Sequence, residues 1–458
     1  MILAAGFSTV DTFFFLSGFF LCFTVAKQKG NGPIVFIVGV TRRLIRTCVP
    51  LFFLILCLYG LEPFVGGPTI KTFFENLRYE VSSHWWQLLL QTRNFYPTVG
   101  KNPIPHAWYL SADLQLFIVS LLTLLVLRRR SKTLVLAAFA FLSLLSCAGG
   151  VCVVASLKLP PFMIFPGPSP DVMMRTADEY YIRPYYHAVC YFGGCITYLI
   201  KEDFRKARIC KRLLQAGWCG CVTCGLFCVF VKFAWVTSFD AVPQGVTLSA
   251  AFFDRILWTL FLAWITLACS TGRGGVLTQL LSWNAYVPLS KLSFGVYLIH
   301  VPFLNIMFDG SRERMYWSMF NQVTLLFALL VWCFLLSYLA FLVCEAPTAG
   351  LEKMVFARVT ERIRKKERTD WDATHAGNIQ NDGGNSRKQD NAQMTFFRIV
   401  SQKKKRGWAA EEIPSLVFDR DPESDVCDDD DVLLDSGDCQ TDLSGCDEKR
   451  MCVQPTPP

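Results

Sequence analysis

Nine hydrophobic runs constrain the fold of this chain more than any other feature of its sequence. A helix of about 18 to 25 apolar residues is long enough to cross the roughly 30 Å of hydrocarbon in a lipid bilayer. The composition agrees, because 52% of the residues are hydrophobic and only 18% are charged. We therefore predict an all-α fold, a polytopic integral membrane bundle of about nine transmembrane helices. The runs cover residues 9–26, 48–65, 107–127, 133–156, 184–201, 213–236, 249–270, 287–308 and 320–344.

The positive charges predict how this bundle is oriented. Lys and Arg follow the first, third, fifth, seventh and ninth runs, and such residues are typical of cytosolic loops. We therefore expect the N-terminus outside and the C-terminus in the cytosol. One loop departs from this rule, because Arg312 and Arg314 lie on the other side, beside Asp309 and Glu313.

The hydrophobic pattern ends near residue 351. Basic clusters follow, then a polar stretch over 370–395 and an acidic run that includes Asp428. Segments of low hydrophobicity and high charge do not bury enough apolar surface to fold. We predict a membrane domain at 1–350 and a cytosolic, largely disordered tail at 351–458.

The 19 cysteines predict neither a disulfide framework nor a metal site. Fifteen lie in or beside the hydrophobic runs, where a thiol behaves as a small apolar side chain. The tightest group, Cys219, Cys221 and Cys224, lies inside a run without a nearby His or carboxylate. We expect no metal and no nucleic acid, and membrane lipids as the neighbours of the chain.

A carboxylate in the first run is the first candidate functional group. On a helix, Asp11, Phe15, Gly18 and Cys22 fall on one face. An ionisable group in hydrocarbon is costly, so it usually faces the bundle interior and is often functional. For Asp11 alone, a polar residue near a helix end that reaches the headgroups is an equally good interpretation.

The helix predicted at 107–127 carries polar side chains on opposite faces. Asp113 and Gln115 are two positions apart, which turns them nearly opposite ways on a helix. Lipid cannot satisfy polar groups at this depth. We therefore expect protein or water, rather than lipid, on both sides of this helix end.

Seven segments that follow one another over residues 10–353 form the strongest pattern in the sequence. They are Val10–Phe19 (VDTFFFLSGF), Arg42–Pro50, Trp108–Gln115, Arg183–Tyr185, Gly274–Trp283, Pro288–His300 and Glu345–Lys353. Together they resemble the membrane domain of the acyltransferase type 3 family, and most closely its animal branch named "nose resistant to fluoxetine". The resemblance does not extend to the tail.

The resemblance implies an O- or N-acyltransferase without a bound cofactor. Its donor would be a cytosolic acyl-CoA, acting as co-substrate, and its acceptor a lipid or a small molecule. The family's most distinctive active-site feature is an Arg followed, after ten intervening residues, by an essential His, on a helix that precedes the one at 9–26. This sequence has no such helix, so we expect a chain truncated at its N-terminus. Whether it is an active enzyme is left open.

In the light of the resemblance, the polar residues of the membrane domain divide into three sets. Asp11 and Asp113 are candidates to orient a catalytic His, and His300 is a candidate substitute base, although a packed helix histidine explains His300 as well. The donor-binding candidates, which would hold phosphates, are Arg42, Arg43, Arg46 and Lys291. The acceptor-path candidates are Arg183, Tyr185, Asp254 and Arg255. The usual excess of Lys and Arg in cytosolic loops explains Arg42, Arg43 and Arg46 nearly as well as donor binding does.

Two other function classes remain open. A bundle with a polar interior could transport lipids or small amphiphiles without reacting with them. The missing Arg/His helix favours a non-catalytic membrane partner instead. We expect a multi-pass protein of the plasma membrane or an endomembrane, and the sequence does not determine its oligomeric state.

Overall fold

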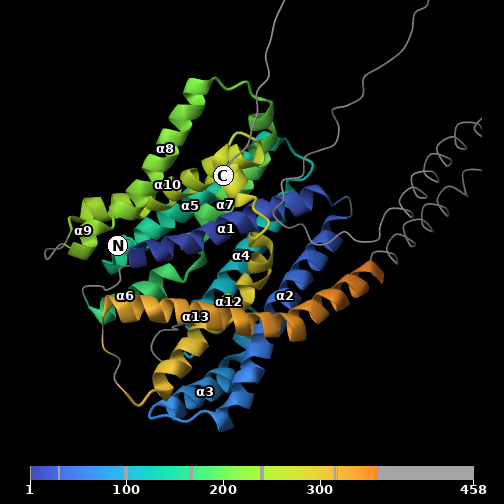
Figure 1. Cartoon of the computed structure of the whole chain (residues 1–458). Helices are drawn as coiled ribbons and strands as arrows, with labels where there is room; N and C mark the ends of the chain where they lie inside the picture. Colours follow the sequence, from blue (N-terminus) through green and yellow to red (C-terminus); the bar gives the residue numbers. More distant parts are fainter. Residues whose placement is uncertain are drawn as a thin grey trace, which may run out of the picture. The chain divides into compact units, whose positions relative to one another are not determined.

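The computed structural model describes residues 2–28, 31–96, 102–163, 169–237, 242–313, 316 and 318–358. Within these ranges the chain forms helices and no strands (Figure 1). The tail that we predict to be disordered lies, from residue 359 onward, outside the described residues.

Each of the nine hydrophobic runs coincides with a long helix. Eight of the helices in the described ranges are long and apolar enough to cross a membrane. This confirms the predicted all-α polytopic membrane bundle. The nine helices are α1 (Ile2–Ala26), α2 (Gly32–Leu61), α4 (Trp108–Val126), α5 (Lys132–Leu157), α7 (Pro184–Lys206), α8 (Lys211–Phe230), α10 (Gln244–Ser270), α12 (Tyr286–Gly310) and α13 (Met319–Ala340).

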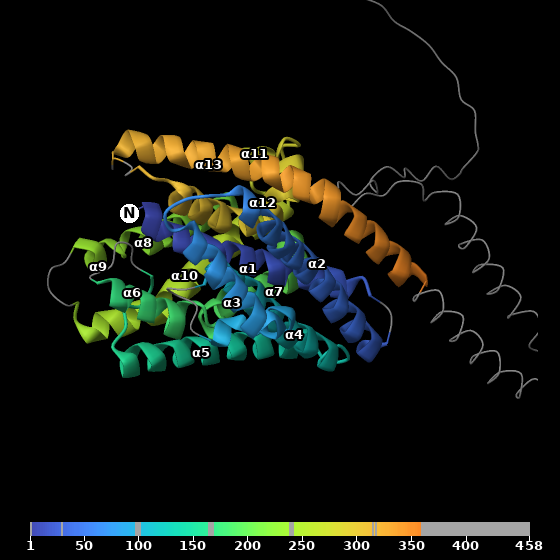
Figure 2. The ribbon, with the colours of Figure 1, turned by 90° about the horizontal axis from the view of Figure 1, so that it is seen from below.

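Among these nine, α7 is the helix that is not apolar enough to count as a candidate span. Eleven of its 23 residues are buried. It packs against α1, α5 and α10, and it lies among these helices in both views (Figures 1 and 2). Because the neighbours of α7 are protein rather than lipid, its surface can carry polar side chains that lipid would not tolerate.

Residues 66–106, which separate the second and third hydrophobic runs, contain a helix, α3 (Ile70–Leu89). Ile70, Phe73, Phe74 and Leu77 are all buried, and their spacing of three and four residues is that of an amphipathic helix. This stretch is therefore not an irregular loop. Helix α3 has 20 residues, but its charged residues make it too polar to count as a candidate span.

Residues 158–183, between the fourth and fifth hydrophobic runs, likewise contain α6 (Pro170–Thr176) and a π-helical turn, η4 (Ala177–Tyr181). The Ser169 hydroxyl accepts a hydrogen bond from the Val172 N–H at 3.3 Å, and Pro170 occupies the first helical position. Both are standard helix-start signals. The remaining short elements are η1 (Glu62–Phe64), η2 (Arg93–Phe95), η3 (Pro105–Ala107), α9 (Phe233–Thr237), α11 (Val276–Leu281) and η5 (Phe341–Glu345).

The centre of the bundle is the contact between α1 and α7. A Cβ atom on Gly18 would lie 2.0 Å from the Tyr191 carbonyl oxygen, and one on Gly194 would lie 2.0 Å from that of Phe15. The two helix backbones therefore touch, which small residues allow in membrane helices. The predicted interior face of the first helix is confirmed, because Asp11, Phe15 and Cys22 are all buried.

A second group of helices packs beside this centre. α12 contacts α13, α2 and α3, and Figure 2 shows α13 and α5 on opposite sides of α1 and α7. A buried apolar cluster that includes Leu51, Leu110 and Leu298 joins α2, α4 and α12. Helix α4 therefore lies between the two groups, and the polar residues at its start face both of them.

Candidate functional site

The first of three polar clusters joins α1, α7 and α10 around Asp11. Its carboxylate accepts a hydrogen bond from His187 Nδ1 at 2.6 Å and one from Arg255 Nη1. His187 Nε2 donates to the Tyr181 carbonyl at 2.8 Å. Both ring nitrogens of His187 therefore face acceptors, and neither has a free lone pair. His187 is buried completely, so it can position Asp11 but cannot take a proton from a substrate.

Asp254 and Lys232 extend this Asp11 cluster. Arg255 Nη1 lies 3.6 Å from Asp254 Oδ2, and Lys232 donates to the Ser8 hydroxyl. The buried cations and carboxylates lie close together, as buried charges must if they are to be tolerated. Within the described residues, neither carboxylate oxygen of Asp254 has a hydrogen-bond partner. The cluster ties three helices together and leaves Asp254 with spare acceptor capacity.

The second cluster joins α1, α2 and α4 around Asp113. Arg43 Nε donates to Asp113 Oδ2 at 3.0 Å, and the Ser17 hydroxyl donates to Oδ1 at 2.9 Å. The Arg43 guanidinium also lies 4.5 Å from the centre of the Phe117 ring. Arg43 and Asp113, which the sequence assigned to the donor-binding and catalytic sets respectively, therefore form one ion pair.

The third cluster brings together His106 of η3 and His300 of α12, whose ring centres are 5.3 Å apart. Pro302 lacks an N–H, so the Leu298 carbonyl four residues earlier loses its usual helical donor. His106 Nε2 donates to that carbonyl at 3.1 Å. The proton of a neutral His106 is therefore on Nε2, and its Nδ1, which has no partner among the described residues, carries a lone pair.

His300 is held in the opposite tautomer. Its Nδ1 donates to the Tyr297 carbonyl at 2.7 Å, within its own helix. The Nε2 of a neutral His300 therefore carries the lone pair. The Tyr297 hydroxyl donates to the His106 carbonyl and links the two histidines again. This His106–His300 pair thus contains two imidazole nitrogens that carry lone pairs.

Aromatic side chains connect the first and third clusters. The Phe14 and Trp108 rings stack on His187 with centres 4.5 and 5.0 Å away. The next residue, Tyr109, packs on Phe14 at 4.7 Å and on Tyr297 at 5.4 Å. The Asp11 cluster and the His106–His300 pair therefore share one packed aromatic wall at the start of α4.

The acceptor-path candidates divide between two places. Asp254 and Arg255 belong to the Asp11 cluster, whereas Arg183 Nη1 donates to the Asn94 carbonyl at 3.3 Å and the Tyr185 hydroxyl donates to the Glu179 carbonyl at 2.8 Å. Asn94 in turn forms two hydrogen bonds with the Gln115 side chain, at 2.8 and 3.0 Å. Asp113 and Gln115 therefore each meet protein, as we expected for this helix end.

The donor-binding candidates also separate. Arg43 belongs to the Asp113 cluster, and Arg42 forms an ion pair with Glu352 at 2.8 Å. Arg46 and Lys291 are exposed. Within the described ranges, no three His, Cys, Asp or Glu side chains come together in a way that could hold a metal ion.

Three functional-looking residues were missed in the sequence. His106 directly precedes a hydrophobic run, and His187 follows several tyrosines near the start of another. Lys232 lies near the end of the run at 213–236. A lone His or Lys beside an apolar run gives no local signal, because its partners lie far away in the chain.

Comparisons with known proteins bear on what these clusters do. A model of the acyltransferase domain of the acyltransferase type 3 family matches residues 1–342. The curated protein "Nose resistant to fluoxetine protein 6" of Caenorhabditis elegans is 26% identical over 382 residues, which cover 76% of this chain and 45% of that protein. This chain thus spans less than half the length of that relative. No solved structure gives a significant match.

Proposed function

This chain belongs to the acyltransferase type 3 family, and on that premise we propose that it transfers an acyl group inside the membrane. It is a multi-pass membrane protein of acyltransferase type. We propose an acyl-CoA as the donor, bound from the cytosolic side, and a hydroxyl or amine of a lipid or small molecule as the acceptor.

The His106–His300 pair is the observation that carries this proposal. Acyl transfer to a hydroxyl or amine requires a base that has a lone pair and can reach the acceptor proton. His187 has no free nitrogen, whereas His300 Nε2 and His106 Nδ1 both do. His300 is only partly buried, so it is the better candidate for contact with an acceptor, and His106 is a positioning residue beside it.

The proposed reaction conserves atoms and charge. His300 Nε2 removes the proton from the acceptor as the acceptor oxygen or nitrogen bonds to the thioester carbonyl carbon. The carbon–sulfur bond then breaks, and the imidazolium returns the proton to the departing CoA thiolate. Asp11 and Asp113 act at a distance by holding α1, α2, α4 and α7 in register, and Arg46 and Lys291 attract the CoA phosphates.

The test is acyl transfer from radiolabelled acyl-CoA by purified protein in lipid nanodiscs, with lipid extracts as acceptors. His300→Gln should lower the rate about 10²–10⁴-fold, the usual contribution of a general base. The matched control is His84→Gln, because His84 lies on α3 and pairs with Glu80 outside the three clusters.

Equal activity of His300→Gln and the wild type would refute the role of His300. Movement of lipid from one leaflet to the other in vesicles that contain the protein, without any acylation, would instead favour a transporter. An inactive wild type that still folds would favour the non-catalytic partner.

A further inference from the structure

Helix α3 has an exposed face whose polarity changes along its length. The exposed side chains of its first half are mostly charged or polar and include Lys71, Thr72, Glu75 and Arg78. At its end the exposed side chains are instead large and apolar, namely Trp85, Trp86, Leu89 and Leu90. A contiguous exposed apolar surface of this kind marks contact with a membrane or with another protein. The end of α3 therefore has a different neighbour from its start.

Helix α3 runs back along the last part of α2, and it lies beside that part of α2 in Figure 1. Near its start, Phe73 belongs to one buried cluster with Leu58 of α2. At its end, the Leu89 carbonyl accepts a hydrogen bond from the Cys48 thiol at 3.6 Å. The ten residues of α2 from Leu58 back to Cys48 extend about 15 Å. The end of α3 therefore lies about 15 Å further along α2 than its start.

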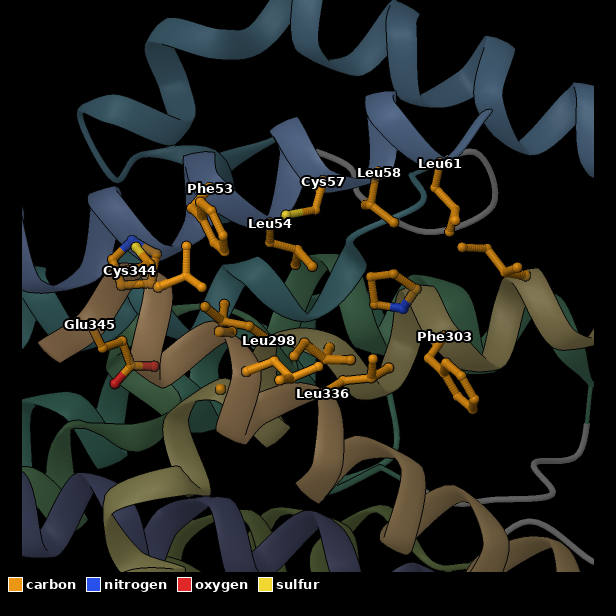
Figure 3. Close-up of a pocket in the computed structure, with 18 residues that line it drawn as sticks. Phe53, Leu54, Cys57, Leu58, Leu61, Leu298, Phe303, Leu336, Cys344 and Glu345 are labelled. Atoms are coloured by element: carbon orange, nitrogen blue, oxygen red, sulfur yellow. The ribbon is translucent and has the colours of Figure 1, made fainter. Parts of the chain in front are cut away.

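The part of α2 that α3 follows lies at the depth of the hydrocarbon. No charged residue occurs from Pro50 to Leu61, and α2 is a candidate membrane span. This stretch also lines a groove between α12 and α13 (Figure 3), whose side chains are hydrocarbon or thiol groups with the exception of Glu345. A helix that is apolar all round belongs in a protein core or in a membrane. The end of α3 packs beside the same stretch and so reaches the same depth.

The chain turns back at this depth, and protein groups satisfy several polar groups of the turn. Gln91 adopts a left-handed conformation with a φ of 54°, and its carbonyl accepts a hydrogen bond from Gln115 Nε2 at 3.0 Å. The Asn94 side chain is completely buried and bonds to the same Gln115. Arg93 and Glu80, both buried, form an ion pair. Non-helical backbone occurs at membrane depth where protein covers it, as it does at this turn.

We propose that α3 is a re-entrant helix, which enters the bilayer on the side where α2 ends and turns back inside it without crossing. Its apolar end contacts the acyl chains of the lipids in that leaflet, which we predict to be the outer one. The charged start of α3 remains at the headgroups. A descent of about 15 Å is half of the roughly 30 Å of hydrocarbon, so a helix with a polar start can make it.

A second protein is the other class of neighbour that would cover the exposed end of α3. The polarity gradient favours lipid, because it follows the depth of α3 along α2. The exposed face is charged where α2 ends and apolar where α3 lies deepest. A bilayer changes in polarity with depth in the same direction, whereas a protein interface has no such dependence.

The experiment is electron paramagnetic resonance of the full chain in lipid nanodiscs. A spin label is attached to p-azidophenylalanine in place of Leu90, so the native cysteines stay unlabelled. Oxygen concentrates in the bilayer and a nickel chelate in water. The label should be more accessible to oxygen than to the chelate, as should one at Leu335, an exposed residue of the span α13. A label at Glu75, on the exposed face near the start of α3, is the matched control and should show the reverse.

Two outcomes would overturn the proposal. Greater access of the nickel chelate than of oxygen at Leu90 would place the end of α3 in water. Low access of both reagents at Leu90, together with normal oxygen access at Leu335, would show that a protein covers this surface.

A second measurement needs no label. A carboxylate among acyl chains is costly, so Leu90→Glu should lower the thermal unfolding midpoint in nanodiscs. Thr72→Glu, on the exposed start of α3, should leave the midpoint unchanged or raise it, because acidic residues favour a helix start. Equal midpoints for these two variants would contradict a lipid-embedded end of α3.

Discussion

Hydrogen-bond partners give the three histidines His106, His187 and His300 different roles. His187 donates from both ring nitrogens, whereas His106 and His300 each donate from one and keep a lone pair on the other. All three are histidines beside or within apolar helices, so residue type alone does not distinguish them. The difference arises from the carbonyl and carboxylate groups that each ring meets.

Pro302 is expected to act on the reaction through His106. In Pro302→Ala the new N–H competes with His106 Nε2 for the Leu298 carbonyl, so the tautomer of His106 is no longer held. One hydrogen bond is worth about 1 kcal/mol, and we expect the transfer rate to fall about fivefold without loss of thermal stability. Pro50→Ala is the control, because Pro50 is also an interior proline and lies on another helix. Equal rates of the two variants would contradict this role.

Asp11 is expected to be essential for stability. Asp11→Asn leaves the buried Arg255 and His187 without their carboxylate, and breaking a buried ion pair costs about 3–5 kcal/mol. Asp203→Asn breaks the exposed pair with Lys132, which is worth about 0–1 kcal/mol. Thermal unfolding in detergent, followed by size-exclusion chromatography, should show a large fall for the first variant and none for the second. Similar unfolding midpoints for the two variants would show that the Asp11 cluster does not stabilise the packing of α1, α7 and α10.

At the scale of elements, the contact of α1 with α7 positions both the Asp11 and the Asp113 clusters. Ser17 and Asp11 lie on α1, and their distance from α2, α7 and α10 depends on how closely the α1 backbone approaches α7. Glycines at 18 and 194 allow that approach. A wider separation of α1 and α7 would therefore lengthen the hydrogen bonds of both clusters at once.

Gly18→Ala tests this contact. The added methyl group would meet the Tyr191 carbonyl oxygen at 2.0 Å, and overpacking of this kind costs about 1–3 kcal/mol or more. Gly220→Ala on α8 is the control, because nothing lies within 4 Å of its Cβ position and alanine favours a helix by about 1 kcal/mol. We expect a lower unfolding midpoint for the first variant and an unchanged or higher one for the second. An unchanged midpoint in Gly18→Ala would refute the tight contact.

For the whole molecule, the distribution of Lys and Arg predicts the orientation in the membrane. A glycosylation sequon inserted in the loop 158–183 should be modified in cells, because we expect that loop outside. The same sequon inserted at 207–209, after the basic end of α7, should not be modified. The measurement is a gel shift that a glycosidase removes. The reverse pattern would invert the predicted topology.

The positions of the membrane helices and the buried face of α1 could be predicted from the sequence. These properties depend on local hydrophobic length and on helical period, both of which can be read along a single stretch. The sequence also carried the family resemblance, because that resemblance rests on short motifs in order. The signals for α3 and α6 are also present in the sequence, as an amphipathic spacing in α3 and as Ser169 and Pro170 at the start of α6.

The pairing of the buried charges could not be predicted and follows from the packing of the helices. Asp11 meets His187 and Arg255, Arg43 meets Asp113, and His106 meets His300. In each pair the partners lie on different helices, separated by loops and by whole spans. The hydropathy pattern hardly predicts how one helix is rotated relative to another. That rotation sets every one of these distances. A lone charge in an apolar run therefore predicts that a partner exists. Only the packed bundle shows which residue that partner is.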